Sequence, residues 1–357
     1  MSIWSRPGVR WALPAGVATL LVAGTALAPA LAASAEVELP ERSAQQLLAD
    51  LLTADAAGYS GTVSWDADLG LPTLPAGMTG NTSLASLLDG SHTLRVWRSG
   101  DRARMAVHGT LGEFDVFVDG SEVWTWSSDE NTATHLNLPA LGSQPAPAAG
   151  PPPVSPEQVA GLALALLSPS TSVATGPAVE VAGRPAYQLV IAPAEPGSLI
   201  GSIRIAVDAV EHVPTRVQVY PAGSDSPALE VGFTSLDFNA PDDDALTFTP
   251  PPGATVTEHA YDDARAIDAN PAAGGAAVVG KGWTMVLVAQ APAPDPNAPG
   301  ELSALLAALP RVSGQWGSGH LLTSRLFSVL LTDDGRILAG AVDGDALQAA
   351  AAAATLD

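Results

Sequence analysis

The stretch EFDVFVDGSEVWTW, residues 113–126, decides the expected fold because two alternating segments flank a turn signal. An Asp-Gly pair accepts the positive φ values of a type I′ turn, so Asp119 and Gly120 are expected to close a hairpin in which Val116 pairs with Val123. Side chains alternate across a strand. One face then carries Phe114, Val116, Val118, Val123 and Thr125, and the other carries Glu113, Asp115, Phe117, Glu122, Trp124 and Trp126. This pattern indicates an antiparallel sheet with one dry face and one face toward solvent or a covering segment.

The same alternation continues on both sides of this hairpin. Two strands joined at residues 99–101 precede it, and a second meander follows over residues 187–191, 203–208, 215–220 and 229–238. The polar residues of the second meander include Arg204, Arg216, Gln218 and Glu230. The apolar positions that we expect to line one face are Leu94, Val96, Met105, Val107, Phe114, Val116, Val118, Val123, Ile203, Ile205, Val217, Val219, Val231 and Phe233.

Helix signals lie between and after these strands. Ser43 and Gln46 have the spacing of a capping box ahead of leucines at helical intervals. Ser155 and Pro156 predict the start of a short apolar helix. Shorter apolar segments occupy residues 69–75 and 83–88, and the C-terminal part predicts a strand at 283–289, a helix near 302–309, a hairpin over 326–341 and an alanine-rich helix from Asp345. The expected class is therefore α+β.

Composition limits the classes of function. The chain has 357 residues, is 47% hydrophobic and carries a net charge of −22. This much apolar content suffices for a large core, and the negative charge repels nucleic acid. The absence of cysteine excludes disulfides and a lipid-modified cysteine anchor.

The amino terminus predicts export. Arg6 and Arg10 precede an apolar run over residues 11–33, followed by small residues that suit signal peptidase. An uncleaved membrane anchor is the alternative, because a run of this length could span a bilayer. Helix-breaking Pro14 and Pro29 favour a cleaved signal, after which the protein lies outside the cytoplasm, secreted or held at the outer face of the membrane.

Catalytic and metal-binding motifs are not found in the sequence. It has no Cys, no paired histidines, no glycine-rich phosphate loop and no Gly-x-Ser-x-Gly elbow. His108 and His135 are expected to be structural. The acidic run at residues 242–244 lacks the alternating ligand spacing of a calcium loop and is expected to be a solvated turn. We expect no enzyme activity, no cofactor and no metal.

Several segments in order resemble the LolA-like lipoprotein-carrier superfamily, whose relatives include RseB-type stress sensors. They are RVWRSGDRARM at residues 95–105, the hairpin at 114–126, IAVD at 205–208 before VPTR at 213–216, and the segment from Phe238 through PDDDALTFTPPPGATV at 241–256. The resemblance covers roughly residues 45–256. The part beyond Trp283 is similar to extensions of exported members from high-GC Gram-positive bacteria, and the Ala/Gly/Pro/Arg-biased composition agrees with that origin.

The resemblance implies an unclosed antiparallel half-barrel whose concave apolar face is lidded by helices and accepts acyl chains, with a C-terminal α/β extension. It divides the chain into a signal or anchor at 1–35, a half-barrel domain at 36–260 and an extension at 261–357. Val116, Met105 and Val107 match cavity-lining positions, and Arg98 matches a basic residue that influences ligand release in carriers. A solvated turn arginine is the plainer interpretation of Arg98.

Two functions follow from the resemblance. The first is a non-enzymatic carrier or chaperone for lipid or lipoprotein acyl chains, with a membrane transporter as its partner. The second is an extracytoplasmic sensor that binds a membrane signalling protein. Patterning alone also fits an ordinary packed α+β core, with no cavity at all.

Overall fold

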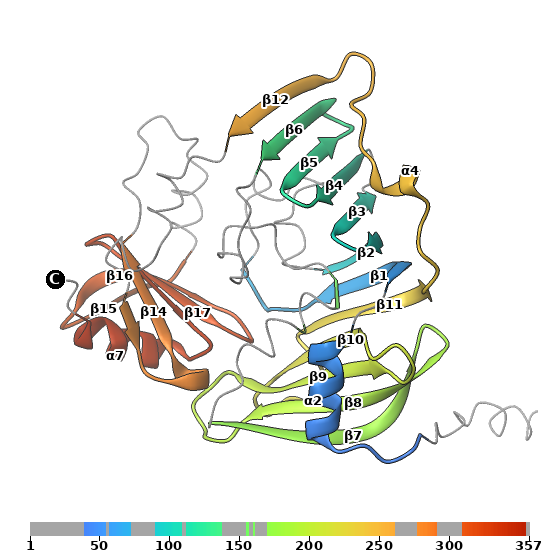
Figure 1. The fold of residues 1–357 in the computed structure, drawn as a ribbon. Helices are drawn as coiled ribbons and strands as arrows, with labels where there is room; N and C mark the ends of the chain where they lie inside the picture. Colours follow the sequence, from blue (N-terminus) through green and yellow to red (C-terminus); the bar gives the residue numbers. More distant parts are fainter. Residues whose placement is uncertain are drawn as a thin grey trace, which may run out of the picture. The chain divides into compact units, whose positions relative to one another are not determined.

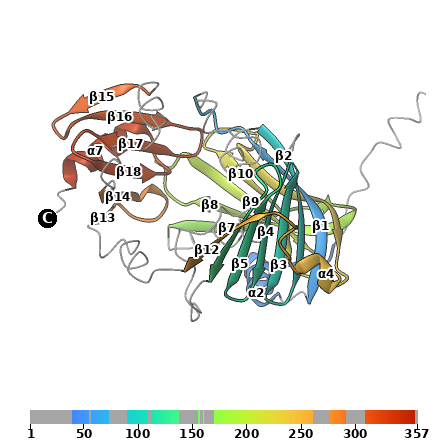
Figure 2. The same cartoon turned by 90° about the horizontal axis from the view of Figure 1, so that it is seen from above.

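The computed structural model describes residues 39–54, 57–72, 90–108, 112–137, 155–156, 160, 170–260, 277–290 and 309–354. The signal segment, the expected helix at 83–88, all but the last residue of the one expected near 302–309, and most of the one expected from Ser155 lie outside these ranges. Figures 1 and 2 show the described elements as two sheets.

The larger sheet has twelve strands and does not close, with β7 and β12 as its two edges. Its order is β12-β6-β5-β4-β3-β2-β1-β11-β10-β9-β8-β7, and every neighbouring pair is antiparallel except β12 with β6. The expected unclosed half-barrel is confirmed. Its strands are β1 (Gly58–Ala67), β2 (Gly90–Ser99), β3 (Arg102–His108), β4 (Glu113–Asp119), β5 (Glu122–Ser127), β6 (Thr132–Asn137), β7 (Thr171–Val181), β8 (Arg184–Pro193), β9 (Ile200–Asp208), β10 (Pro214–Pro221), β11 (Leu229–Asp237) and β12 (Thr255–Ala260).

The smaller sheet has six strands in the order β13-β14-β18-β17-β16-β15, all antiparallel. Its strands are β13 (Ala277–Val279), β14 (Val286–Gln290), β15 (Arg311–Gly314), β16 (Gly317–Thr323), β17 (Ser328–Thr332) and β18 (Arg336–Gly340). Of the C-terminal elements predicted from the sequence, the strand, the hairpin and the alanine-rich helix are present. Trp283, however, lies in the short 3-10 helix η3 (Gly282–Thr284) rather than in the strand.

Helix α2 (Ala44–Thr53) covers β7 and β8. Its N-terminus is the predicted capping box: the hydroxyl of Ser43 accepts from the backbone N–H of Gln46, whose side chain accepts from the backbone N–H of Ser43. The side chain of Leu47 is fully buried. This helix covers one end of the apolar sheet face, as a lidding helix was expected to do.

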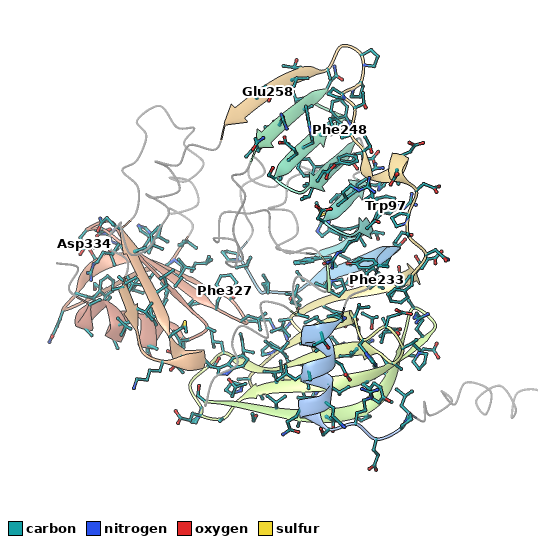
Figure 3. The ribbon with its side chains drawn as sticks, in the orientation of Figure 1. Trp97, Phe233, Phe248, Glu258, Phe327 and Asp334 are labelled. Carbon is teal, nitrogen blue, oxygen red and sulfur yellow. The ribbon has the colours of Figure 1, made fainter. Side chains whose placement is uncertain are left out.

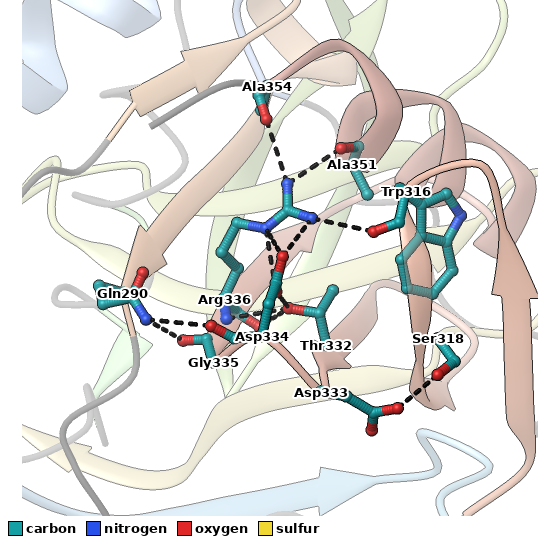
Figure 4. Close-up of polar contacts among 10 residues, drawn as sticks. All are labelled: Gln290, Trp316, Ser318, Thr332, Asp333, Asp334, Gly335, Arg336, Ala351 and Ala354. Atoms are coloured by element: carbon teal, nitrogen blue, oxygen red, sulfur yellow. Dashed lines mark hydrogen bonds and ion pairs between the residues drawn. The ribbon is translucent and has the colours of Figure 1, made fainter. Parts of the chain in front are cut away.

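Helix α7 (Gly344–Ala353) packs against β14, β17 and β18. Figure 4 shows how Arg336 caps the C-terminal end of this helix by hydrogen bonds. The guanidinium donates to the carbonyls of Ala351 and Ala354, 3.0 and 3.1 Å away, and to Trp316, and it pairs with Asp334. Hydrogen bonds from Arg336 lower the pKa of Asp334. The arginine therefore satisfies carbonyls that a helix end leaves without an intrahelical partner.

The hairpin at residues 113–126 has a different register from the predicted one. Asp119 pairs with Glu122, and Val116 pairs with Thr125, so Gly120 and Ser121 form the two-residue turn. Gly120 takes a φ of +57°, and Ser121 has no positive φ, which is the pattern of a type II′ turn with glycine first. The predicted pairing of Val116 with Val123 is wrong. The faces are nevertheless as predicted, because the shift in pairing is by an even number of residues.

Candidate functional site

The predicted cavity residues share one continuous face of the twelve-stranded sheet. One row across the strands joins Val116, Met105 and Val96; the next joins Phe114, Val107 and Leu94 and continues through Val63 to Phe233. Two further rows join Val231, Val217 and Ile205, and Val219 with Ile203. All fourteen predicted residues belong to, or pack against, a single buried apolar cluster: Leu94, Val96, Met105, Val107, Phe114, Val116, Val118, Val123, Ile203, Ile205, Val217, Val219, Val231 and Phe233.

Burial along this face is uneven. Ile205, Val217 and Val231 are fully buried, in the same cluster as Leu47 of α2 and Trp283. At β4 and β5, by contrast, Phe114, Val118 and Val123 are only partly buried. The apolar face is therefore less covered at its β4–β5 end, while the β9–β11 end has the character of an ordinary core.

Residues of the smaller sheet and its loops contact the more buried end of this face, at β7–β9. The indole Nε1 of Trp283 donates to the hydroxyl of Thr171 on β7 at 2.8 Å, and the backbone N–H of Leu199 donates to Ala341 at 2.8 Å. Leu326 and Phe327 join the same apolar cluster. These contacts fix the β7–β9 end of the face.

Arg98 lies at the rim of this face. It is the Cα partner of Ala103, which pairs with Val118, which pairs with Val123. Its side chain is half-buried, and its Nε lies 3.5 Å from the carbonyl of Gly100. The register thus brings the predicted release residue into one row with the accessible apolar residues.

The opposite face of β2–β6 is partly covered. The segment after β11 crosses it through the short helix α4 (Asp243–Leu246), and Figure 3 shows Phe248 and Trp97 on this side of the sheet. The ring of Phe248 lies 5.0 Å from that of Phe117 and 5.3 Å from that of Trp124. Arg102 pairs with Asp243. The covering segment that the alternation allowed is therefore residues 238–254.

Asp115 lies on this partly covered face and does not meet solvent. It is 2% exposed, and its carboxylate accepts from Arg104 at 2.8 Å. Burial raises the pKa of Asp115, although the hydrogen bond from Arg104 acts in the opposite direction. Alternation places a side chain on a face, but the neighbours that cover that face decide whether it is exposed.

His135 forms a clasp that sequence reasoning missed. Its Nδ1 lies 2.7 Å from the carboxylate of Glu258 on β12, and its Nε2 contacts Glu122 on β5. Its ring stacks on Trp124 with centroids 4.2 Å apart. Since both nitrogens face carboxylates, only the imidazolium can donate to both. The hydrogen bond to Glu258 raises the pKa of His135; burial opposes this rise, and Glu122 adds to it.

We expect the attachment of β12 to weaken as pH rises. A raised histidine pKa contributes stability that is complete below the unfolded value of about 6.5 and is lost as pH passes the higher folded value. Amide hydrogen exchange between pH 6 and 9, corrected for intrinsic rates, should show falling protection in β12. The His135→Gln variant should lack this dependence. Equal protection of β12 at both ends of the range would contradict the clasp.

A hollow of about 530 Å³ lies between α2 and the β7–β8 edge. It is lined by Leu39, Leu47 and Tyr187 on its apolar side and by Arg42 and Gln188 on its polar side, among others. Arg42 pairs with Asp50 and lies over the Tyr187 ring. None of the fourteen predicted cavity residues lines this hollow.

Within the described ranges, no group of three or more His, Asp or Glu side chains is arranged to hold a metal ion. No helix in these ranges has the length and apolar content needed to cross a membrane.

Comparison with known proteins gives matches among solved structures alone. No family model matches the chain, and no curated protein matches it. The MucA/MucB complex of Pseudomonas aeruginosa matches at 18% identity over 86% of this chain and 96% of that chain, with a TM-score of 0.44. A LolA superfamily protein from Nitrosomonas europaea matches at 8% identity over 58% and 99%, with a TM-score of 0.25. A putative outer membrane lipoprotein-sorting protein domain from Vibrio parahaemolyticus matches at 12% identity over 54% and 89%, with a TM-score of 0.19.

Proposed function

We propose that this protein is an extracytoplasmic, non-enzymatic binder of lipid or lipoprotein acyl chains. The observation that carries the proposal is the continuous apolar face of the unclosed sheet, which is only partly buried at Phe114, Val118 and Val123. Burial of an acyl chain gains about 0.8 kcal/mol per methylene, so an apolar surface of tolerant shape suffices. Arg98, which shares a row with Val118 and Val123, is the candidate for influencing release.

Binding should depend on acyl-chain length. We expect a neutral fluorescent probe, N-phenyl-1-naphthylamine, to bind the purified protein saturably and to be displaced by lysophosphatidylcholines. Each added methylene between ten and fourteen carbons should tighten competition by up to about fourfold. Displacement that does not change with chain length, or probe binding that appears only near the unfolding temperature, would contradict the proposal.

Export is tested separately. Small residues at the −3 and −1 positions predict that the mature chain begins at Ala33 or Glu36. Amino-terminal sequencing of protein released by the native host should find one of these two residues. An intact Met1 or Ser2 start in the membrane fraction would instead establish an anchor.

A further inference from the structure

The two sheets have four edge strands, β7 and β12 on the larger sheet and β13 and β15 on the smaller, and these edges are not equally protected. Strands β13 and β15 have only three and four residues. Strand β7 contains Pro177, at the point where its register with β8 shifts between Gly176 and Val179. Short edge strands, proline and bulges are the features by which proteins prevent a further strand from adding to a sheet.

Strand β12 has none of these protective features. Its six residues read TVTEHA, without proline or lysine, and they pair with β6 in an unbroken register. Figure 1 shows β12 as the outermost strand on its side of the larger sheet. No described strand pairs with its outer side. An unprotected edge of this kind is a template for pairing with another chain.

The backbone groups that face the open side of β12 follow from the ladder on its other side. The N–H of Thr255 donates to the carbonyl of Asn131, just before β6, at 3.0 Å. Because backbone groups point alternately to the two sides of a strand, those of Val256 and Glu258 point to the open side. The side chain of Val256 is 43% exposed, so it offers an apolar contact to a strand that adds there.

The surroundings of this edge are acidic. Residues 112–137 and 247–260, which hold β4, β5, β6 and β12, contain no lysine or arginine. Their acidic residues are Glu113, Asp115, Asp119, Glu122, Asp129, Glu130 and Glu258. Arg104 pairs with two of them and His135 contacts two more, whereas Glu130 is exposed and forms no ion pair with a described residue. With a net charge of −22 on the whole chain, this edge attracts cationic groups and repels a second copy of the same protein.

We propose that the open edge of β12 binds an extended basic peptide of a partner protein, which adds to the twelve-stranded sheet as a further strand. Hydrogen bonds to the backbone of Val256 and Glu258 supply the affinity, as they do wherever a peptide adds to a sheet edge. The acidic surroundings favour lysine or arginine in that peptide. Because backbone groups at the edge, and not the apolar face, make these contacts, the inference does not depend on the acyl-chain binding proposed above.

Fluorescence anisotropy of a labelled peptide of alternating lysine and valine, titrated with the purified protein at low ionic strength, tests the edge. Val256→Pro removes an outward N–H but no hydrogen bond to β6, a position at which edge strands tolerate proline, and it should weaken binding at least about tenfold. The matched control is Val256→Thr, which keeps the N–H and a β-branched side chain and should bind within about threefold of the parent. A peptide with glutamate in place of lysine should not bind.

A second measurement tests strand pairing on the parent protein itself, whatever the stability of Val256→Pro. The lysine–valine peptide methylated at every backbone nitrogen keeps its charge but has no N–H to donate, so it should not bind. Peptide binding that the methylated peptide reproduces, binding that a folded Val256→Pro protein retains, or no binding at about 1 mM peptide would overturn the proposal. Sedimentation of the protein alone tests the other occupant: a dimer that Val256→Pro abolishes would assign the edge to a second copy and would also overturn it.

Discussion

Replacing Val116 by arginine is expected to abolish binding of the naphthylamine probe and of acyl lipids. Val116 is 5% exposed and lies in one row with Met105 and Val96 on the apolar face. An unpaired guanidinium brought there has no partner, and the desolvation cost of about 3 kcal/mol corresponds to a more than hundredfold loss of affinity. Probe titration measures the loss of affinity, and thermal unfolding of the same sample measures any loss of stability.

The control and a second variant keep this test decisive. Asp115 is unsuitable as an outward-facing control because it is buried against Arg104, so Glu130→Arg, in the exposed turn before β6, takes its place and should bind normally. If Val116→Arg unfolds, Val123→Arg provides the second test, because its partly buried position should let the protein stay folded. A folded Val123→Arg protein that binds the probe with parental affinity would refute the acyl site.

Removing the carboxylate of Asp208 is expected to cause the largest loss of stability. Asp208 is 1% exposed and accepts from Arg184 at 2.6 and 3.0 Å and from the backbone N–H groups of Val210 and Glu211, both at 2.9 Å. Asp208→Ala leaves these donors without their acceptor, at a cost of about 3 kcal/mol. Chemical denaturation should show this loss, whereas Asp225→Ala, in an exposed turn, should stay within about 0.5 kcal/mol of the parent.

The same aspartate should contribute to acid sensitivity. Burial favours the neutral acid, but the hydrogen bonds from Arg184 and from the two backbone N–H groups outweigh it and lower the pKa of Asp208. A lowered pKa gives stability that is present above the unfolded value of about 3.9 and is lost as pH falls through the folded value. The parent should therefore lose more stability below pH 4 than Asp208→Asn does. Parallel pH curves for the two proteins would contradict this.

Much of the fold was predictable from local patterns. The alternation at residues 113–126 placed Val116, Val118 and Val123 on one face, and the register confirms this. The Ser43 capping box and the second meander were also as predicted. The exact pairing of the hairpin was not predicted, because an Asp-Gly pair is compatible with more than one turn. Here Gly120 is the first of the two central turn residues, whereas the prediction made it the second.

Other features depended on residues far apart in the chain. Strand β12 pairs in parallel with β6, which no hairpin signal predicts. His135 has no motif around it, and the glutamate on β12 that contacts its Nδ1 lies 123 residues further along the chain. Phe248 covers Phe117 in the same way, across a large separation in sequence. These contacts join residues far apart in the chain and leave no local motif in the sequence.

The sequence by itself determined which side chains share a face, because the two-residue period of a strand is fixed by covalent geometry. It therefore placed the fourteen apolar residues together and set Arg204 and Arg216 apart from them. Only the tertiary structure decided what covers each face: α2 and Trp283 over one end of the apolar side, and residues 238–254 over part of the other. Coverage is decided by packing between distant segments, which is why Asp115 is buried while Arg95 remains exposed.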